Sequence, residues 1–181
     1  GTTAELERQY AEGLAAQQPE PGTGGGGGTT PVTPPPTTPD PPVPPVPPTP
    51  VGSVVDRAIA FAKAQLGEPY RLGGMGPDAW DCSGLTKASY ASVGVYVGTH
   101  SSTDQYDYMA SQGRLVPYGQ AQPGDLIFYS DGGSASIPRK YHVAIYLGGG
   151  KMIEAPNPSA PVRIVNVRTS DLVPYVGRPT G

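Results

Sequence analysis

The chain has 181 residues, 26 of them glycine and 24 proline, and a formal net charge of −3. Five acidic residues and one arginine precede Ser53, which leaves a net charge of about +1 for the remainder. The sequence has no basic stripe and no apolar run near the roughly 18 residues that cross a membrane. We therefore expect no nucleic-acid partner and no membrane span. A single cysteine allows no internal disulfide.

Residues 1–18 form the first region. Leu6, Tyr10 and Leu14 recur every four residues on one stripe, which predicts a short helix, although Gly13 weakens the pattern. Isolated helices of this length are marginal in water. The segment is therefore a short helix or the remnant of an upstream coiled coil, and a frayed tail fits equally well.

Residues 19–52 form a linker, with 14 prolines between Pro19 and Pro50 and a run of glycines at 24–28. It has too few aliphatic side chains to offset the entropy of ordering, so we expect disorder. The stretch 31–50 favours polyproline II and would extend about 60 Å at roughly 3.1 Å per residue. It is either a spacer or a proline-rich ligand for a partner. Thr/Pro-rich stalks are typical of exported proteins, so we expect secretion.

Residues 53–181 have a globular composition and are predicted to form one compact domain. Its first half contains three helical patterns, each with a glycine after its end, and the first and third begin with a capping residue. The predicted helices run from the cap Ser53 to Leu66, from Cys82 to the residues before Gly94, and from the cap Ser102 to Gly113.

The second half of this domain changes to a period of two with β-branched residues, which predicts strands. Turn signals with glycine or proline separate them. The predicted strands are 114–116, 125–129, 142–147, 151–155, 162–167 and 175–178. Helices first and strands afterwards predict an α+β fold, in which the N-terminal helices pack on one side of an antiparallel sheet.

Cys82, at the start of the second predicted helix, is the candidate nucleophile. The reactive form of cysteine is the thiolate, and a helix N-terminus favours this anion. We therefore expect the pKa of Cys82 to be below that of a free thiol. Trp80 is a candidate wall of the site. A lone cysteine is more often a small apolar filler, so the assignment depends on partners later in the chain.

The candidate partners are His142 and Glu154, on two consecutive predicted strands. Val143 and its alternate neighbours form an aliphatic core face, so His142 points to the opposite face. A three-residue loop around the glycines at 148–150 would set Glu154 opposite His142. A two-residue turn would instead set Glu154 against Val143 in the core, where an unpaired carboxylate would be costly. We expect the first register, in which the carboxylate accepts an imidazole N–H.

Four motifs follow one another along this domain. They are PYRLGG at 69–74, DCSGL at 81–85, QPGDLIF at 122–128 and HVAIYLG at 142–148, the last followed by MIEA at 152–155. In this order they resemble the NlpC/P60 peptidases, from about Ser53 to the C-terminus. The resemblance implies a papain-like α+β fold and hydrolysis of peptide bonds in peptidoglycan stems, commonly between D-glutamate and the diamino acid.

The resemblance also implies roles for individual residues. Cys82 would attack the γ-D-glutamyl carbonyl, His142 would take and return the proton, and Glu154 would orient the imidazole. The family commonly has histidine at the position of Glu154. A glutamate there resembles the actinobacterial resuscitation-promoting-factor-interacting hydrolases. The implied oxyanion-stabilising and substrate-binding residues are Tyr70, Asp81, Ser83, Ser101 and Ser102. His100 has no matching catalytic role and is interpreted as a loop or pocket residue.

Two other functions stay open: a wall-binding module without turnover, and an acyltransferase that uses the same Cys–His pair. No metal or other cofactor is implied, because two histidines and one cysteine lack ligand spacing. We expect a monomer that acts on peptidoglycan stem peptides and is secreted and cell wall-associated. A further hypothesis is that the stripe of Leu6, Tyr10 and Leu14 folds back and covers the cleft.

Overall fold

A computed structural model describes residues 52–180 of the chain. The helix predicted within residues 1–18 and nearly all of the linker predicted at 19–52 lie outside these residues. The predicted covering of the cleft by the N-terminal segment lies outside them as well. Among the helices that the structure describes, none is long and apolar enough to cross a membrane.

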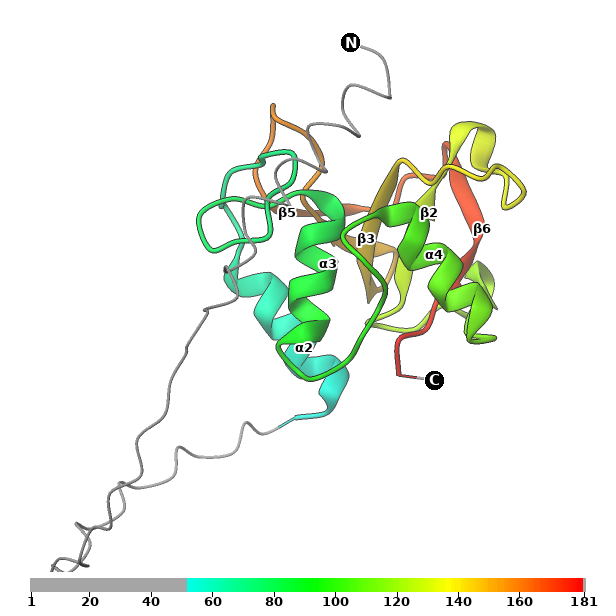
Figure 1. Ribbon diagram of the computed structural model, residues 1–181, viewed down its shortest axis with the longest axis horizontal. Coiled ribbons are helices and arrows are strands. Elements are labelled where there is room, and N and C mark those ends of the chain that lie inside the picture. Colours follow the sequence, from blue (N-terminus) through cyan, green and yellow to red (C-terminus); the bar gives the residue numbers. More distant parts are fainter. Residues whose placement is uncertain (1–51, 181) are drawn as a thin grey trace, which may run out of the picture. The chain divides into compact units, whose positions relative to one another are not determined.

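Three α-helices lie on one face of a single sheet: α2 (Val54–Ala64), α3 (Cys82–Ala91) and α4 (Ser102–Ser111), as Figure 1 shows. At the start of α2, the Ser53 hydroxyl accepts the Asp56 N–H and the Asp56 carboxylate accepts the Ser53 N–H, both at 3.1 Å, which confirms the predicted capping box. The predicted end at Leu66 was wrong. The chain leaves the helix at Gln65, so that the following Gly67 N–H donates to the carbonyl of Val162 at 3.0 Å.

The two later helices also begin at side chains that accept backbone N–H groups. Asp81 caps α3 by accepting the Gly84 N–H at 2.7 Å. Ser101 caps α4 by accepting the Asp104 N–H at 3.3 Å. The predicted cap Ser102 was one residue too late, because its hydroxyl donates instead to the loop before the central strand.

The sheet has six antiparallel strands in the order β1-β6-β2-β3-β4-β5. They are β1 (Leu115–Pro117), β2 (Leu126–Tyr129), β3 (His142–Gly148), β4 (Lys151–Glu154), β5 (Arg163–Asn166) and β6 (Leu172–Gly177). Two short 3-10 helices, η1 (Tyr118–Gln120) and η2 (Asp131–Gly133), lie between them and were not predicted. The α+β class, with helices first and an antiparallel sheet after them, is confirmed.

The hairpin of β3 and β4 has a register that differs from both predicted alternatives. Gly148 pairs with Lys151 across a two-residue turn, and then Tyr146 pairs with Met152, so that Leu147 is an extra residue in β3. Without this bulge, Glu154 would face the helices. The bulge shifts the pairing by one residue and returns Glu154 to the face of His142.

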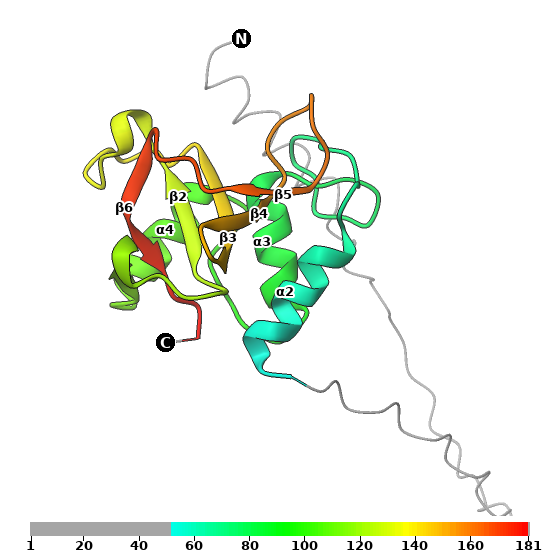
Figure 2. The same ribbon diagram turned by 180° about the vertical axis from the view of Figure 1, so that it is seen from behind.

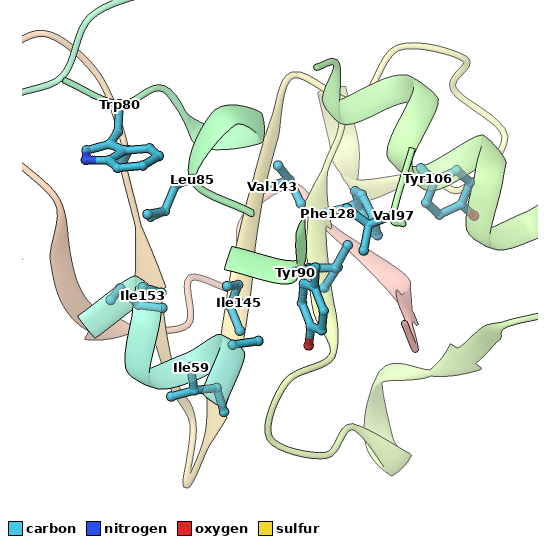
Figure 3. Close-up of a cluster of buried hydrophobic side chains, with 14 of the residues drawn as sticks. Ile59, Trp80, Leu85, Tyr90, Val97, Tyr106, Phe128, Val143, Ile145 and Ile153 are labelled. Atoms are coloured by element: carbon cyan, nitrogen blue, oxygen red, sulfur yellow. The ribbon is translucent and has the colours of Figure 1, made fainter. Parts of the chain in front are cut away.

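Each face of the sheet packs on its own apolar cluster. On the helix side, Ile59 of α2 and Leu85 and Tyr90 of α3 pack against Val143 and Ile145 of β3 (Figure 3). On the other side, which faces the viewer in Figure 2, a smaller cluster is formed by Ile127, Tyr129, Ala144, Met152 and Val176. His142 and Glu154 belong to this second side, and Cys82 belongs to the first.

Candidate active site

The N-terminus of α3 is held by the turn that precedes it. The Gly73 N–H donates to the Asp81 carboxylate at 2.8 Å, and the Asp81 N–H donates to the Gly74 carbonyl at 2.9 Å. A Cβ atom at Gly84 would lie 2.0 Å from that same carbonyl oxygen. Only glycine at 84 allows this approach, so the helix start that carries Cys82 has a fixed position.

The surroundings of Cys82 do not favour the thiolate in the resting structure. Burial, and then the charge of the adjacent Asp81, raise the pKa of Cys82 to about 12. The backbone N–H groups of Val143, Ser83 and Cys82 itself hydrogen-bond the sulfur and oppose this shift. The expected fall in the pKa of Cys82 is therefore wrong for the resting site, because desolvation outweighs the helix N-terminus.

Tyr70 lies beside the thiol. Burial, followed by the charges of Cys82 and Asp81, raises the pKa of Tyr70 to about 12. The phenol therefore keeps its proton at neutral pH and is available as a hydrogen-bond donor. This position fits the predicted role of Tyr70 as an oxyanion-stabilising residue, which stays a prediction.

Asp81 is buried and engaged on both oxygens. Besides the two backbone N–H groups described above, its Oδ1 lies 2.6 Å from the Nε2 of His100 and 3.4 Å from the Ser83 hydroxyl. His100 is also buried, with 7% of its surface exposed. The structure therefore places His100 in a histidine–carboxylate pair next to Cys82, which sequence analysis did not anticipate.

His142 and Glu154 form a second histidine–carboxylate pair. The imidazole Nε2 lies 2.7 Å from the Glu154 Oε2, so the predicted contact is confirmed, although the register that produces it is not the predicted one. The Glu154 side chain is completely buried, and His142 is 5% exposed. An ionised carboxylate can only accept hydrogen bonds, so Nε2 of the imidazole is the donor in this contact.

Two arginines hold the Glu154 carboxylate. Arg163, its partner across the β4–β5 ladder, donates from Nε and Nη2 to Oε1 at 3.2 and 3.1 Å. Arg168 donates from Nη1 to Oε1 at 2.9 Å and from Nη2 to Oε2 at 2.8 Å. Burial alone would raise the pKa of Glu154, but the hydrogen bonds and charges of His142 and Arg168 lower it to about 2. Glu154 therefore stays ionised at any physiological pH.

The thiol and the His142–Glu154 pair meet at the first residues of β3. The N–H that reaches the Cys82 sulfur belongs to Val143, the residue directly after His142. The helix α3 packs on β3 along this contact. The Cys82 sulfur therefore lies next to the peptide group that joins His142 to Val143.

Two pockets lie near these groups. One, of about 240 Å³, is lined by Tyr70 and by the loops 67–70 and 158–161, which lie side by side in Figures 1 and 2. The other, of about 340 Å³, is on the His142 side. Its lining residues are Tyr141, His142, Pro156, Asn157, Arg163 and Arg168. Within residues 52–180, no three His, Cys, Asp or Glu side chains gather as metal ligands.

The other predicted site residues have their polar groups engaged within the fold. The Ser83 hydroxyl donates to Asp81, the Ser101 hydroxyl caps α4, and the Ser102 hydroxyl donates to the Lys140 carbonyl at 2.7 Å. Their roles in substrate binding stay predictions. Trp80 is not a wall of either pocket, because its indole is buried edge-on against Phe61, with ring centroids 6.0 Å apart.

Sequence analysis missed the residues that surround Glu154. Arg163 had a usable signal, because pairing the predicted strands 151–155 and 162–167 in an antiparallel ladder sets a glutamate opposite an arginine. Arg168 had none, because it follows the end of β5 and its reach depends on the path of the chain there. His100 was interpreted as a loop or pocket residue, but its pairing with Asp81 requires the folded loop before α4.

A cysteine at a helix start, set beside a histidine–carboxylate pair on an antiparallel sheet, defines a papain-like α+β domain. The model of the NlpC/P60 family matches residues 67–176, which is more than half of the chain. The chain belongs to the NlpC/P60 family.

Two curated relatives come from Mycobacterium tuberculosis. Peptidoglycan endopeptidase RipA is 41% identical over 128 residues, which cover 64% of this chain and 25% of RipA. Peptidoglycan endopeptidase RipB is 38% identical over 137 residues, which cover 68% of this chain and 52% of RipB. The chain thus spans about a quarter of one relative and about half of the other.

Solved structures show the same fold. The structure of the peptidoglycan hydrolase RipB from M. tuberculosis superposes with a TM-score of 0.58 at 36% identity, covering 69% of this chain and 64% of that one. The structure of RipD from the same organism, described as a non-catalytic NlpC/P60 domain protein adapted to peptidoglycan binding, has a TM-score of 0.56 at 30% identity. It covers 70% of this chain and 98% of that chain. The family thus contains proteins described as hydrolases and one described as a binding protein.

Proposed function

We propose that this domain is a cysteine endopeptidase that hydrolyses peptidoglycan stem peptides at the bond between D-glutamate and the diamino acid. Cys82 is the nucleophile, His142 the general base and acid, and Glu154 the carboxylate that orients His142. The relatives named peptidoglycan endopeptidases support the substrate class. The family resemblance supports the choice of bond.

The resting charges constrain the mechanism. Because the pKa of Cys82 is raised, the thiol gives up its proton as it attacks the carbonyl, and the Nδ1 of His142 receives it. Glu154, kept ionised by its arginines, then stabilises the imidazolium. The oxyanion is stabilised by N–H groups at the start of α3 and by the Tyr70 hydroxyl. His142 returns the proton to the leaving amine, and water hydrolyses the thioester.

The observation that carries this proposal is the buried His142–Glu154 contact of 2.7 Å, directly beside the peptide group that reaches the Cys82 sulfur. The test is digestion of a defined stem peptide, with the masses of the products measured. Two fragments whose summed mass equals that of the peptide plus one water support the proposal, provided that Cys82→Ala produces no such fragments. An unchanged peptide would contradict it.

A wall-binding module without turnover is the second candidate, since RipD has this fold and is described as non-catalytic. The same digestion separates it from the endopeptidase: the peptide is retained by the protein and recovered intact. A gain in mass without added water would instead indicate the acyltransferase that uses the same Cys–His pair.

The proposed substrate also sets where the protein acts. A hydrolase of wall peptides must leave the cytoplasm to reach them, so we propose that the protein is secreted and associated with the cell wall. Fractionation of cells that produce the protein from its native gene tests this. Recovery of the protein only from the cytoplasm would contradict it.

A further inference from the structure

Two arginines line the pocket on the His142 side, and Asp171 lies behind it, where its carboxylate accepts the Tyr141 hydroxyl at 3.1 Å. Arg163 and Arg168 both donate to Glu154, so two guanidinium charges face one carboxylate. The arginine side chains are 41% and 43% exposed, whereas Glu154 is completely buried. The positive charge that Glu154 does not neutralise therefore lies on the pocket side, and protonation of His142 during catalysis adds to it.

The donors at the pocket surface are fixed in place. Arg168 is held by two hydrogen bonds to Glu154 and lies over the ring of Tyr129, with its Cζ 5.0 Å from the ring centroid. Arg163 uses Nε and Nη2, and no hydrogen bond within residues 52–180 engages its Nη1. Asn157 accepts the Ser159 N–H on its Oδ1 at 2.9 Å, which turns its side-chain NH2 outward as a donor.

Planar donors with excess positive charge match a carboxylate, which accepts two parallel N–H bonds from a guanidinium. An ammonium group would be repelled by the same pair of arginines. A neutral amide would gain fewer and weaker hydrogen bonds. The pocket therefore selects an anionic group on the ligand.

We propose that this pocket, lined by Tyr141, His142, Pro156, Asn157, Arg163 and Arg168, binds a carboxylate on the leaving half of the substrate. The inference rests on the proposed function. His142 protonates the leaving amine, so the leaving half lies on the His142 side, where this pocket opens. Arg163, Arg168 and Asn157 are the residues that bind the carboxylate.

The carboxylate has two sources in a stem peptide. It belongs either to the side chain of the diamino acid or to the C-terminus of the residue that follows. Four matched peptides separate the sources, because each of the two groups is supplied either as the acid or as the carboxamide. Amidation of the bound group is expected to raise KM roughly 10- to 100-fold, the range of a charge-assisted hydrogen bond, with little change in kcat. Equal KM values for all four peptides would overturn the proposal.

Arg163 is the residue to replace, because Arg168 bonds both oxygens of Glu154. Arg163→Gln is expected to raise KM for the acid peptide toward that of the carboxamide and so remove the discrimination. Arg163→Lys is expected to retain part of it. The matched control Lys63→Gln removes one exposed positive charge from α2 and is expected to preserve the discrimination. A loss of kcat that is equal for acid and carboxamide peptides would mean that Arg163 only positions Glu154.

A binding measurement separates this proposal from the proposed function. The dipeptide that forms the leaving half, as acid and as carboxamide, is titrated by calorimetry into Cys82→Ala. Tighter binding of the acid supports the pocket even where no peptide is hydrolysed. Hydrolysis together with equal binding of both dipeptides would retain the proposed function and overturn the pocket.

Discussion

Two histidine–carboxylate pairs flank Cys82, and they differ in what surrounds them. His100–Asp81 and His142–Glu154 have nearly the same length, 2.6 and 2.7 Å, and both are buried. Asp81 also accepts the backbone N–H groups of Gly84 in α3 and of Gly73 in the preceding turn, whereas Glu154 is bound only by side chains, two of them arginines. The first pair is built into the helix cap, and the second lines a pocket.

The two carboxylates also differ in the group that their negative charge affects. The charge of Asp81 raises the pKa of Cys82, while Glu154 faces His142 and has its own charge balanced by guanidinium groups. A short histidine–carboxylate contact is therefore not by itself a sign of catalysis. What distinguishes the second pair is a pocket beside its imidazole and two arginines that bind its carboxylate.

The largest expected effect is the loss of turnover in Cys82→Ala. Removing the nucleophile should lower kcat on a soluble stem peptide on the order of 10⁶-fold, because His142 then has no thiol to deprotonate. Circular dichroism should show an unchanged fold. Hydrolysis that persists in the variant after repurification would contradict the assignment of Cys82.

The next effect separates the two histidines. His142→Gln should lower kcat on the order of 10⁴-fold or more, because the proton acceptor is lost. His100→Gln should lower it less than about tenfold, because a glutamine amide still donates to Asp81. Steady-state kinetics of both variants on one peptide measure the difference. Equal losses of kcat in the two variants would contradict the assignment of different roles to His142 and His100.

A smaller effect is expected on acid stability. The pKa of Glu154 is about 2 in the folded protein and about 4.3 when unfolded, so the ionised form stabilises the fold above pH 4.3. This contribution, about 3 kcal/mol, is lost as the pH falls from 4.3 toward 2. The free energy of unfolding of wild type and Glu154→Gln should differ most near pH 6 and converge toward pH 2. A difference that does not depend on pH would contradict the ion-pair account.

The smallest expected effect is on the reactivity of the thiol. Because burial and Asp81 raise the pKa of Cys82, its alkylation by iodoacetamide should be at least about tenfold slower at pH 7 than that of a free thiol. The midpoint of its pH profile should lie above about 8.5. Asp81→Asn should lower the midpoint, and Lys63→Gln should leave it unchanged. A wild-type midpoint below 8.5 would show that His142 outweighs burial.

Local patterns in the sequence predicted most of the fold. The capping box at Ser53 and the start of α3 at Cys82 depend on residues within one turn of each other, and the alternation along β3 depends only on strand geometry. These features form wherever the local sequence permits them. The family motifs, which follow one another in the family's order, added the expected roles of Cys82, His142 and Glu154.

The tertiary structure decided the rest, because it depends on groups that are far apart in the sequence. The bulge at Leu147 sets the face of Glu154, and no local pattern in the sequence marks it. The two arginines reach Glu154 from β5 and from the segment after it. The sequence by itself placed Cys82 at a helix start and His142 and Glu154 on consecutive strands, but it did not identify the arginines around Glu154. Their register, burial and summed charges, which set the pKa values, exist only once the helices and the sheet have packed.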